Sequence, residues 1–143
     1  MVAEEFTVRV VVRGYEIDAN GHVNQAVYHQ YGEHARTEHL RAAGFSAQAY
    51  QEGNLGTVVL ESTIRYLREL NIGDEVDVTS RIEFGAGKAF RFEHELRRLS
   101  DGVVAAEISC VAGVLDKGTR RLVAEPARRL AELLDRPEVL GIS

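Results

Sequence analysis

The chain is short, acidic and apolar enough to fold around one core. Its 143 residues are 45% hydrophobic and carry a formal charge of −5 at pH 7, a balance that excludes a typical nucleic-acid binder with excess Lys and Arg on one face. No apolar run approaches the length of a membrane span, and no proline-rich linker divides the sequence. We therefore expect one domain over residues 1–143.

Cysteine usage and the N-terminus indicate the compartment. Cys110 is the only cysteine, so an intrachain disulfide cannot form. The first five residues are acidic rather than a charged-then-apolar export signal. We expect a cytoplasmic protein.

The first third of the chain predicts one strand and one long helix. Residues 6–13 alternate apolar and polar side chains, which is the pattern of a half-buried strand. After a loop, Asn24 suits a helix N-cap, and a helix is predicted from residue 26 to 43 with Gly44 as its stop. The apolar face of this helix contains Val27, Tyr28, Tyr31, Ala35 and Leu40.

The remaining two thirds predict a meander of antiparallel strands. Four stretches rich in Val, Ile, Phe or Tyr are separated by turns containing Gly, Asn or Asp, and they span residues 58–67, 75–84, 89–99 and 103–115. Pro126 then opens a short amphipathic helix. This order predicts an α+β fold in which a highly curved sheet wraps around the long helix, although periodicity alone leaves several α+β topologies open.

The segment between the first strand and the long helix carries the strongest chemical signal. Asp18 lies in a tight loop immediately ahead of the helix start. A helix N-terminus offers free N–H groups that can hold an oxyanion while a carboxylate attacks a carbonyl or activates water. Thioester hydrolysis suits this pair, because the thiolate leaves without much protonation. The alternative is an Asp that only holds the loop through an Asx-turn.

This loop and helix start resemble the signature of hotdog-fold thioesterases of the 4-hydroxybenzoyl-CoA thioesterase superfamily. The matching residues are the run RGYEIDANGHVNQAVY over 13–28 and Glu33-His34-Ala35-Arg36. Within the superfamily the chain is similar to plant acyl-lipid thioesterases of the methylketone-synthase type. The resemblance implies a five-stranded hotdog sheet around a central helix. It also implies a homodimer or homotetramer with its acyl site between subunits, and an acyl-CoA or acyl-carrier-protein substrate.

The resemblance also implies roles for individual residues. Asp18 matches the catalytic carboxylate, acting as nucleophile or general base, and the backbone N–H of Gln25 matches the group that polarises the thioester carbonyl. His22 and Asn24 are expected to support the site, with Asn24 chiefly capping the helix. Glu61 interrupts an apolar strand, where it either lines the cleft or faces solvent.

Further residues are candidates for substrate binding. Tyr28 is expected in the core or at a subunit contact, and its place at the helix start also makes it a candidate for contact with substrate. In some branches of the superfamily that the chain resembles, a helix carboxylate acts in place of the loop one, which makes Glu33 a candidate; otherwise Glu33 is an exposed helix residue or a partner of Arg36 or Arg65. Basic hairpin residues are candidates for the phosphates of coenzyme A or of a pantetheine arm, namely Lys88, Arg91, Lys117, Arg120 and Arg121.

Other functions find less support in the sequence. The histidines at 29, 34 and 39 lack the His-Glu-x-x-His spacing of a zinc site, so we expect no metal and no cofactor. The glycine-rich turn at 85–88 lacks the strand-to-helix context of a phosphate-binding loop. A non-hydrolytic acyl-binding module, dehydratase-like or cyclase-like, is the alternative function.

Overall fold

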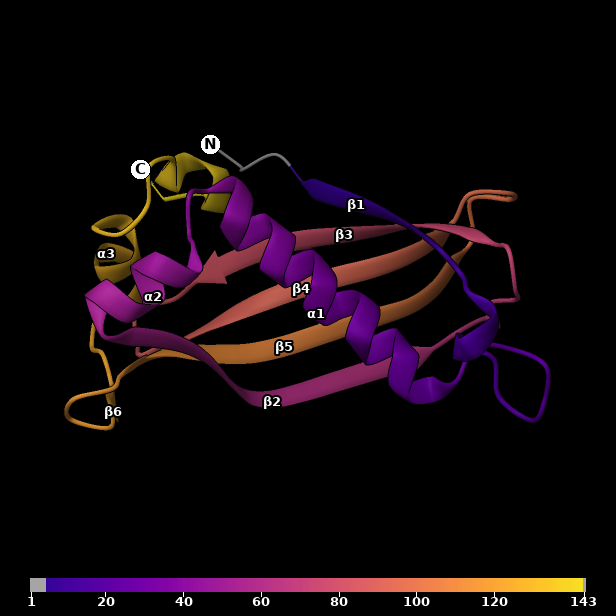
Figure 1. The fold of residues 1–143 in the computed structure, drawn as a ribbon, viewed down its shortest axis with the longest axis horizontal. Coiled ribbons are helices and arrows are strands. Elements are labelled where there is room, and N and C mark those ends of the chain that lie inside the picture. The colour runs from indigo at the N-terminus through magenta and orange to yellow at the C-terminus, as the bar shows by residue number, and fades with distance from the viewer. Residues whose placement is uncertain (1–4, 143) are drawn as a thin grey trace.

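An antiparallel sheet with one long helix across it forms most of the molecule, and the computed structural model describes residues 5–142 (Figure 1). The strands are β1 (Phe6–Val11), β2 (Leu55–Tyr66), β3 (Glu75–Phe84), β4 (Ala89–Arg98), β5 (Val104–Asp116) and β6 (Arg121–Leu122). The helices are α1 (Gln25–Ala42), α2 (Ala47–Gly53) and α3 (Pro126–Ala131), with 3-10 turns η1 (Gly14–Glu16) and η2 (Pro137–Leu140). The predicted α+β arrangement of helix and sheet is confirmed.

The strand order places β2 at a free edge of the sheet. The order is β1-β3-β4-β5-β2, and the short strand β6 pairs with β5 outside this path. Every strand pairing is antiparallel. The register of β2 on β5 shifts between Val59 and Glu61, which marks a bulge at Leu60 and increases the local twist.

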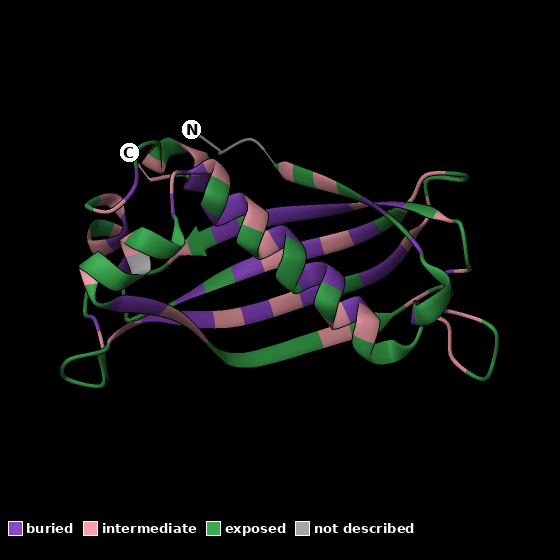
Figure 2. Cartoon of the chain, viewed as in Figure 1, coloured by how far each residue is buried: buried purple, intermediate pink, exposed green. Residues whose placement is uncertain are grey.

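Helix α1 lies across one face of the sheet and buries its apolar side there (Figure 2). Tyr28, Tyr31, Ala35 and Leu40 are all buried, as the sequence predicts, whereas Val27 is only half-buried. These residues recur with the 3.6-residue period of the helix and so form one stripe on its surface. Burial of this stripe holds the helix against the strands.

Gly32 is the point at which α1 comes close to β5. A Cβ built at Gly32 would lie 2.9 Å from Cδ1 of Ile108. The missing side chain therefore lets the helix rest directly on the strand.

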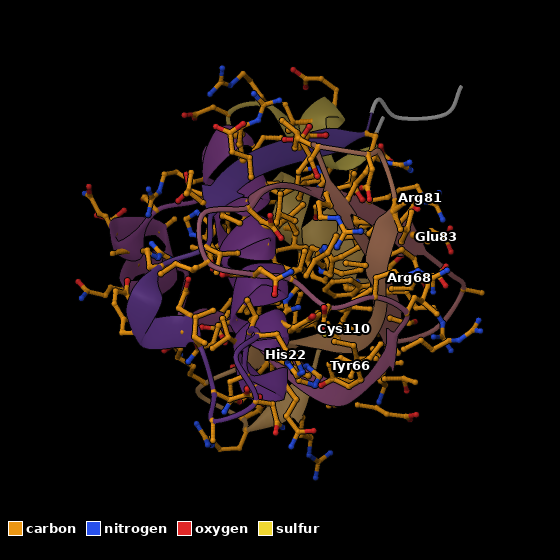
Figure 3. The ribbon with its side chains drawn as sticks, turned by 90° about the vertical axis from the view of Figure 1, so that its right-hand side faces the viewer. His22, Tyr66, Arg68, Arg81, Glu83 and Cys110 are labelled. Carbon is orange, nitrogen blue, oxygen red and sulfur yellow. The ribbon has the colours of Figure 1, made fainter. Side chains whose placement is uncertain are left out.

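The other face of the sheet is charged. Along β3 and β4 buried residues alternate with exposed or half-buried ones, and the latter form ion pairs such as Arg81–Glu83 at 3.1 Å and Arg97–Glu95 at 3.4 Å. Figure 3 shows Arg81 and Glu83 on the far side of the sheet from α1, with Cys110 between helix and sheet. The core therefore lies against α1 along most of the sheet, and near the chain end it also includes Leu130 of α3 and Leu140 of η2.

Several element boundaries depart from the sequence prediction. The first strand ends at Val11 rather than residue 13, because the chain turns into η1. The second strand begins at Leu55, ahead of the predicted residue 58. Helix α2 and strand β6 were not predicted, because seven and two residues are too short to show a clear period.

Candidate active site

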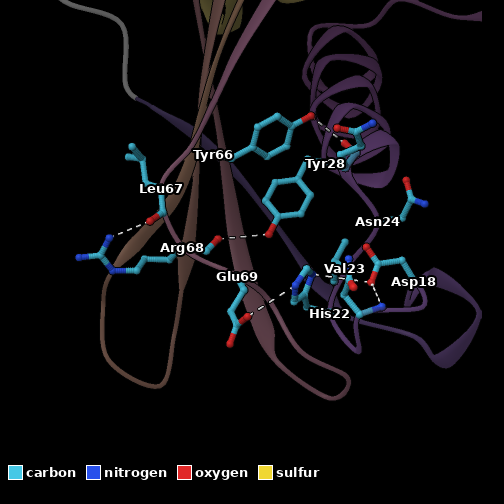
Figure 4. Close-up of a pocket in the computed structure, with 11 residues that line it drawn as sticks. Asp18, His22, Val23, Asn24, Tyr28, Tyr66, Leu67, Arg68 and Glu69 are labelled. Atoms are coloured by element: carbon cyan, nitrogen blue, oxygen red, sulfur yellow. Dashed lines mark hydrogen bonds and ion pairs between the residues drawn. The ribbon is translucent and has the colours of Figure 1, made fainter.

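A cleft of about 590 Å³ opens at the N-terminal end of α1. Three segments that are distant in sequence form its walls: the loop after η1, the first turn of α1, and the end of β2 with the residues that follow (Figure 4). The lining residues are Asp18, Asn20, His22, Val23, Asn24, Gln25, Tyr28, Tyr66, Leu67, Arg68 and Glu69.

The loop that carries Asp18 is a small hairpin tied to the end of β2. Ile17 and Val23 form an isolated antiparallel bridge, and the Asp18 N–H donates to the His22 carbonyl at 2.9 Å. Gly21 has φ +87°, which its missing side chain permits at the tip. The Val23 N–H donates to the Leu70 carbonyl at 2.8 Å, so the loop is fixed to the segment after β2.

The Asp18 carboxylate makes a turn contact and also faces the cleft. Its Oδ1 accepts from the Asn20 N–H at 2.9 Å, the Asx-turn bond considered as the alternative role. No hydrogen bond within residues 5–142 engages Oδ2, and the side chain is 23% exposed. One oxygen therefore holds the loop while the other is available at the cleft wall.

The start of α1 leaves one backbone donor free beside this carboxylate. Asn24 caps the helix as predicted: its side-chain oxygen accepts from the Ala26 N–H at 2.8 Å, and its carbonyl accepts from the Val27 N–H at 2.9 Å. Among the described residues, these bonds leave the Gln25 N–H without an acceptor. Gln25 is one of the residues that line the cleft, and an N–H at the positive end of a helix dipole suits an oxyanion.

His22 lies between two carboxylates. Its Nδ1 is 3.8 Å from Oδ1 of Asp18, and its Nε2 is 3.8 Å from Oε2 of Glu69. The imidazole is about one-third exposed. From this position it can interact with Asp18 and with a bound molecule in the cleft.

Two tyrosines join the end of β2 to the start of α1. The ring centroids of Tyr28 and Tyr66 are 5.1 Å apart in an edge-to-face arrangement. The Tyr28 hydroxyl donates to the Arg68 carbonyl at 3.2 Å, and the Tyr66 hydroxyl donates to the Gln25 carbonyl at 3.0 Å. Burial raises the pKa of Tyr28, so its hydroxyl is protonated at neutral pH and donates to the Arg68 carbonyl.

The other predicted site residues lie outside this cleft. Glu61 is exposed on β2 and Glu33 is exposed on α1, where neither lines the cleft. The structure shows no ion pair of Glu33 with Arg36 or Arg65 within residues 5–142; Arg65 instead approaches Glu107 at 3.8 Å. A role for these two carboxylates stays a prediction.

The predicted phosphate-binding cations lie at the opposite end of the sheet. Tyr66, at the cleft, pairs with Ala106 of β5, whereas Leu55 at the other end of β2 pairs with Asp116. The turns that follow β3 and β5 are at this second end: Lys88 lies in the first and Lys117 and Arg120 in the second, while Arg91 lies near the start of β4 and Arg121 begins β6. Within one chain these side chains do not line the cleft, and their contact with substrate stays a prediction.

Sequence reasoning did not single out the wall formed by residues 66–69. Tyr66, Arg68 and Glu69 line the cleft, yet they follow the helix start by about forty residues. They belong to no local motif, and only the pairing of β2 with β5 brings them to the helix. Their polar cluster at a strand end was the one available signal.

Two further features concern metals and membranes. Within residues 5–142 no three His, Cys, Asp or Glu side chains are grouped in a way that could hold a metal ion. His39 is instead buried against Ser80, with Nδ1 and Oγ 2.9 Å apart. In the same part of the chain, none of the helices has the length and apolar character needed to cross a bilayer.

The fold and the cleft together define a class of protein. An antiparallel sheet curled around a long helix is the hotdog fold of thioesterases. The family model described as "Thioesterase-like superfamily" matches residues 12–136. The chain belongs to this superfamily.

Individual relatives agree with the family assignment. The chain is 30% identical to the acyl-acyl carrier protein thioesterase ATL3 of Arabidopsis thaliana over 119 residues, which covers 83% of this chain but only 63% of that protein. It is 28% identical to the long-chain acyl-CoA thioesterase FadM of Escherichia coli, covering 81% of this chain and 87% of FadM. The solved structure of SAV2348 from Staphylococcus aureus in complex with CoA has a TM-score of 0.82 and 25% identity, covering 93% and 83% of the two chains.

Proposed function

We propose that this protein hydrolyses an acyl thioester of coenzyme A or of acyl carrier protein, releasing the free acid and a thiol. The observation that carries the proposal is the shared cleft of Asp18 and the Gln25 N–H. The names of the relatives agree with it, since ATL3 is an acyl-acyl carrier protein thioesterase and FadM an acyl-CoA thioesterase. In this proposal the enzyme is cytoplasmic and needs no cofactor.

The chemistry divides between the carboxylate and the helix. The Gln25 N–H, with the dipole of α1 behind it, polarises the thioester carbonyl and stabilises the negative charge that develops on its oxygen. Asp18 either attacks the carbonyl carbon, so that the thiolate leaves and a mixed anhydride forms, which water then hydrolyses to the free acid and regenerated Asp18, or it removes a proton from a water that attacks the carbonyl carbon and displaces the thiolate. In both routes the thiolate leaves without a general acid. Both routes need Asp18 in its ionised form.

The remaining cleft residues support these two groups. Asn24 holds the first turn of α1, and His22 lies close enough to interact with Asp18. Tyr66 fixes the Gln25 carbonyl through its hydroxyl, which restrains the peptide group next to the proposed oxyanion donor. Tyr28 forms part of the cleft wall that receives the substrate.

Substitution of Asp18 by Asn separates catalysis from loop structure. Asn can make the same Asx-turn bond to the Asn20 N–H, so a purely structural Asp18 would tolerate the change. We expect a loss of at least about 100-fold in kcat, the usual effect of removing a catalytic base or nucleophile. The measurement is release of free thiol from a panel of acyl-CoA and acyl-carrier-protein substrates.

Asp116 provides a matched control for this experiment. Its Oδ1 accepts from the Gly118 and Thr119 N–H groups at 2.8 and 3.1 Å, in a turn at the other end of the sheet. Asp116→Asn is expected to leave hydrolysis unchanged. A folded Asp18→Asn protein within about threefold of the parent would refute the assignment, and a parent that binds acyl thioesters without releasing thiol would favour the non-hydrolytic alternative.

A further inference from the structure

A second carboxylate, Glu16, is buried directly behind the loop that carries Asp18. Glu16 is the last residue of η1 and is 5% exposed. Its Oε1 accepts from the Tyr31 hydroxyl at 2.7 Å and from the Arg13 N–H at 2.8 Å, and its Oε2 accepts from the Arg13 guanidinium at 3.0 Å. It does not line the cleft, so it has no direct contact with a molecule bound there.

The backbone and the side chain of Glu16 both form hydrogen bonds with α1 or its cap residue. The backbone carbonyl accepts from the Asn24 N–H at 2.9 Å, which fixes the cap of the helix. The side chain binds Tyr31, which lies two turns into the same helix and is 2% exposed. Asp18 follows Glu16 by only two residues. The Glu16–Tyr31 contact therefore connects the catalytic loop to the helix that carries the proposed oxyanion donor.

The hydrogen bond between Tyr31 and Glu16 has a charged acceptor, which makes it stronger than a bond between two neutral groups. Burial alone would raise the pKa of Glu16, but hydrogen bonds from Arg13 and Tyr31 outweigh it and the pKa is lowered overall. The pKa of Tyr31 is raised by its burial and by its bond to Glu16. At neutral pH an ionised carboxylate thus accepts from a neutral phenol, and such charge-assisted bonds are short and strong.

We propose that Glu16 and Tyr31 are positioning residues that hold Asp18 at the correct place relative to the first turn of α1. This inference rests on the proposed thioesterase function and adds to it a pair that does not touch the substrate. Catalysis by a carboxylate and an oxyanion donor depends on their mutual geometry, and a displacement of about 1 Å can cost about 10²-fold in rate. Loss of the Glu16–Tyr31 contact lets the loop shift while the cleft remains able to bind.

Two variants test the pair. Glu16→Gln retains the size of the side chain but places an amide against the Arg13 donors, and Tyr31→Phe removes one hydroxyl and leaves the ring. We expect either change to lower kcat by about 10- to 100-fold and to alter KM by less than about threefold. Steady-state thiol release by the folded proteins gives both constants, with near-UV circular dichroism as the check on folding.

A third measurement distinguishes positioning from general stability. On an Asp18→Asn background the carboxylate to be positioned is absent, so Glu16→Gln and Tyr31→Phe are expected to cause no further loss of rate. Hydrogen exchange of the amides in residues 17–27 should rise in both single variants, while the second half of α1 stays protected. This readout does not depend on activity.

Ser80 supplies the matched control. It makes a buried bond to His39 of 2.9 Å near the other end of α1, so Ser80→Ala removes a comparable contact far from Asp18. We expect its kcat to stay within about twofold of the parent, because only stability is affected.

The outcomes separate this inference from the function on which it rests. Unchanged kcat in both variants, an equal loss in Ser80→Ala, or a further loss on the Asp18→Asn background would each overturn the positioning role while the thioesterase function stands. A parent protein that releases no thiol from any substrate would remove the proposed function and this inference with it.

Discussion

Burial in the core changes the protonation behaviour of one side chain, the imidazole of His94. The side chain is 2% exposed between β4 and α1. Its Nδ1 donates to the Thr79 carbonyl at 2.9 Å, and its Nε2 faces a guanidinium nitrogen of Arg36 at 3.4 Å. Burial, with a smaller effect from Arg36, lowers the pKa of His94 to about 4. The imidazole is therefore neutral in the folded protein at physiological pH.

This neutrality predicts a loss of stability in mild acid. The pKa of His94 is 6.5 in the unfolded chain and about 4 in the folded one. Between these two pH values His94 is protonated in the unfolded chain and neutral in the folded protein. The free energy of unfolding should fall by about 2 kcal/mol between pH 8 and 5 from this residue. His94→Asn removes the titrating group and keeps a donor near Nδ1, so its pH dependence should be flatter.

Urea unfolding of both proteins between pH 8 and 5 measures the difference. Burial also lowers the pKa of His39, which adds acid sensitivity of the same sign to both proteins and cancels in the comparison. Parallel curves for the parent and His94→Asn would contradict the prediction.

At the scale of elements, the start of α1 joins fold stability to the proposed chemistry. Asn24 accepts from two N–H groups of the first turn, and within residues 5–142 the third, on the cleft-lining residue Gln25, has no acceptor. The same residue therefore stabilises the helix and prevents its first turn from fraying where the substrate carbonyl would bind. A cap at the end of a structural helix has only the first of these effects.

Removing the cap should reveal both effects. Asn24→Ala is expected to lower the free energy of unfolding by about 1 kcal/mol and to reduce kcat as well. Ser46→Ala is the matched control, because Ser46 caps α2 through the Ala49 N–H at 3.1 Å, away from the cleft. It should cost a similar amount of stability, measured by urea unfolding, with no change in thiol release. Equal kinetic effects of the two variants would show that capping alone is responsible.

At the scale of the whole molecule, β2 presents a long unpaired edge. β2 has 12 residues, and Val59, Leu60 and Tyr66 on it are 53%, 50% and 46% exposed. An exposed apolar edge strand is a template for pairing with another strand. The outer face of the sheet, in contrast, is covered with ion pairs that would have to be desolvated in a sheet-to-sheet contact. We expect a dimer formed along β2 rather than a tetramer formed through the sheet faces.

A charged substitution on this edge tests the dimer. Leu60→Asp should shift the protein to a monomer in sedimentation equilibrium and lower thiol release, because the resemblance places the acyl site between subunits. Ile72→Asp is the control: Ile72 is 65% exposed in the turn after β2, and its replacement should leave both the mass and the activity unchanged. A Leu60→Asp protein with the parental mass would argue against the β2 interface.

The α+β class of the fold and the first half of the candidate site could be predicted from the amino-acid sequence. Period-two and period-3.6 patterns are local, so the long strands and α1 could be placed to within a few residues, and the loop with Asp18 lies next in sequence to the Asn24 cap. The remaining features became visible in the folded chain. The fold brings residues 66–69 to the start of α1 and Glu16 into hydrogen-bond contact with Tyr31. It also places the basic hairpins at the opposite end of the sheet from the cleft. These relations depend on strand pairing and on packing between residues far apart in the chain, for which local sequence periodicity carries no signal.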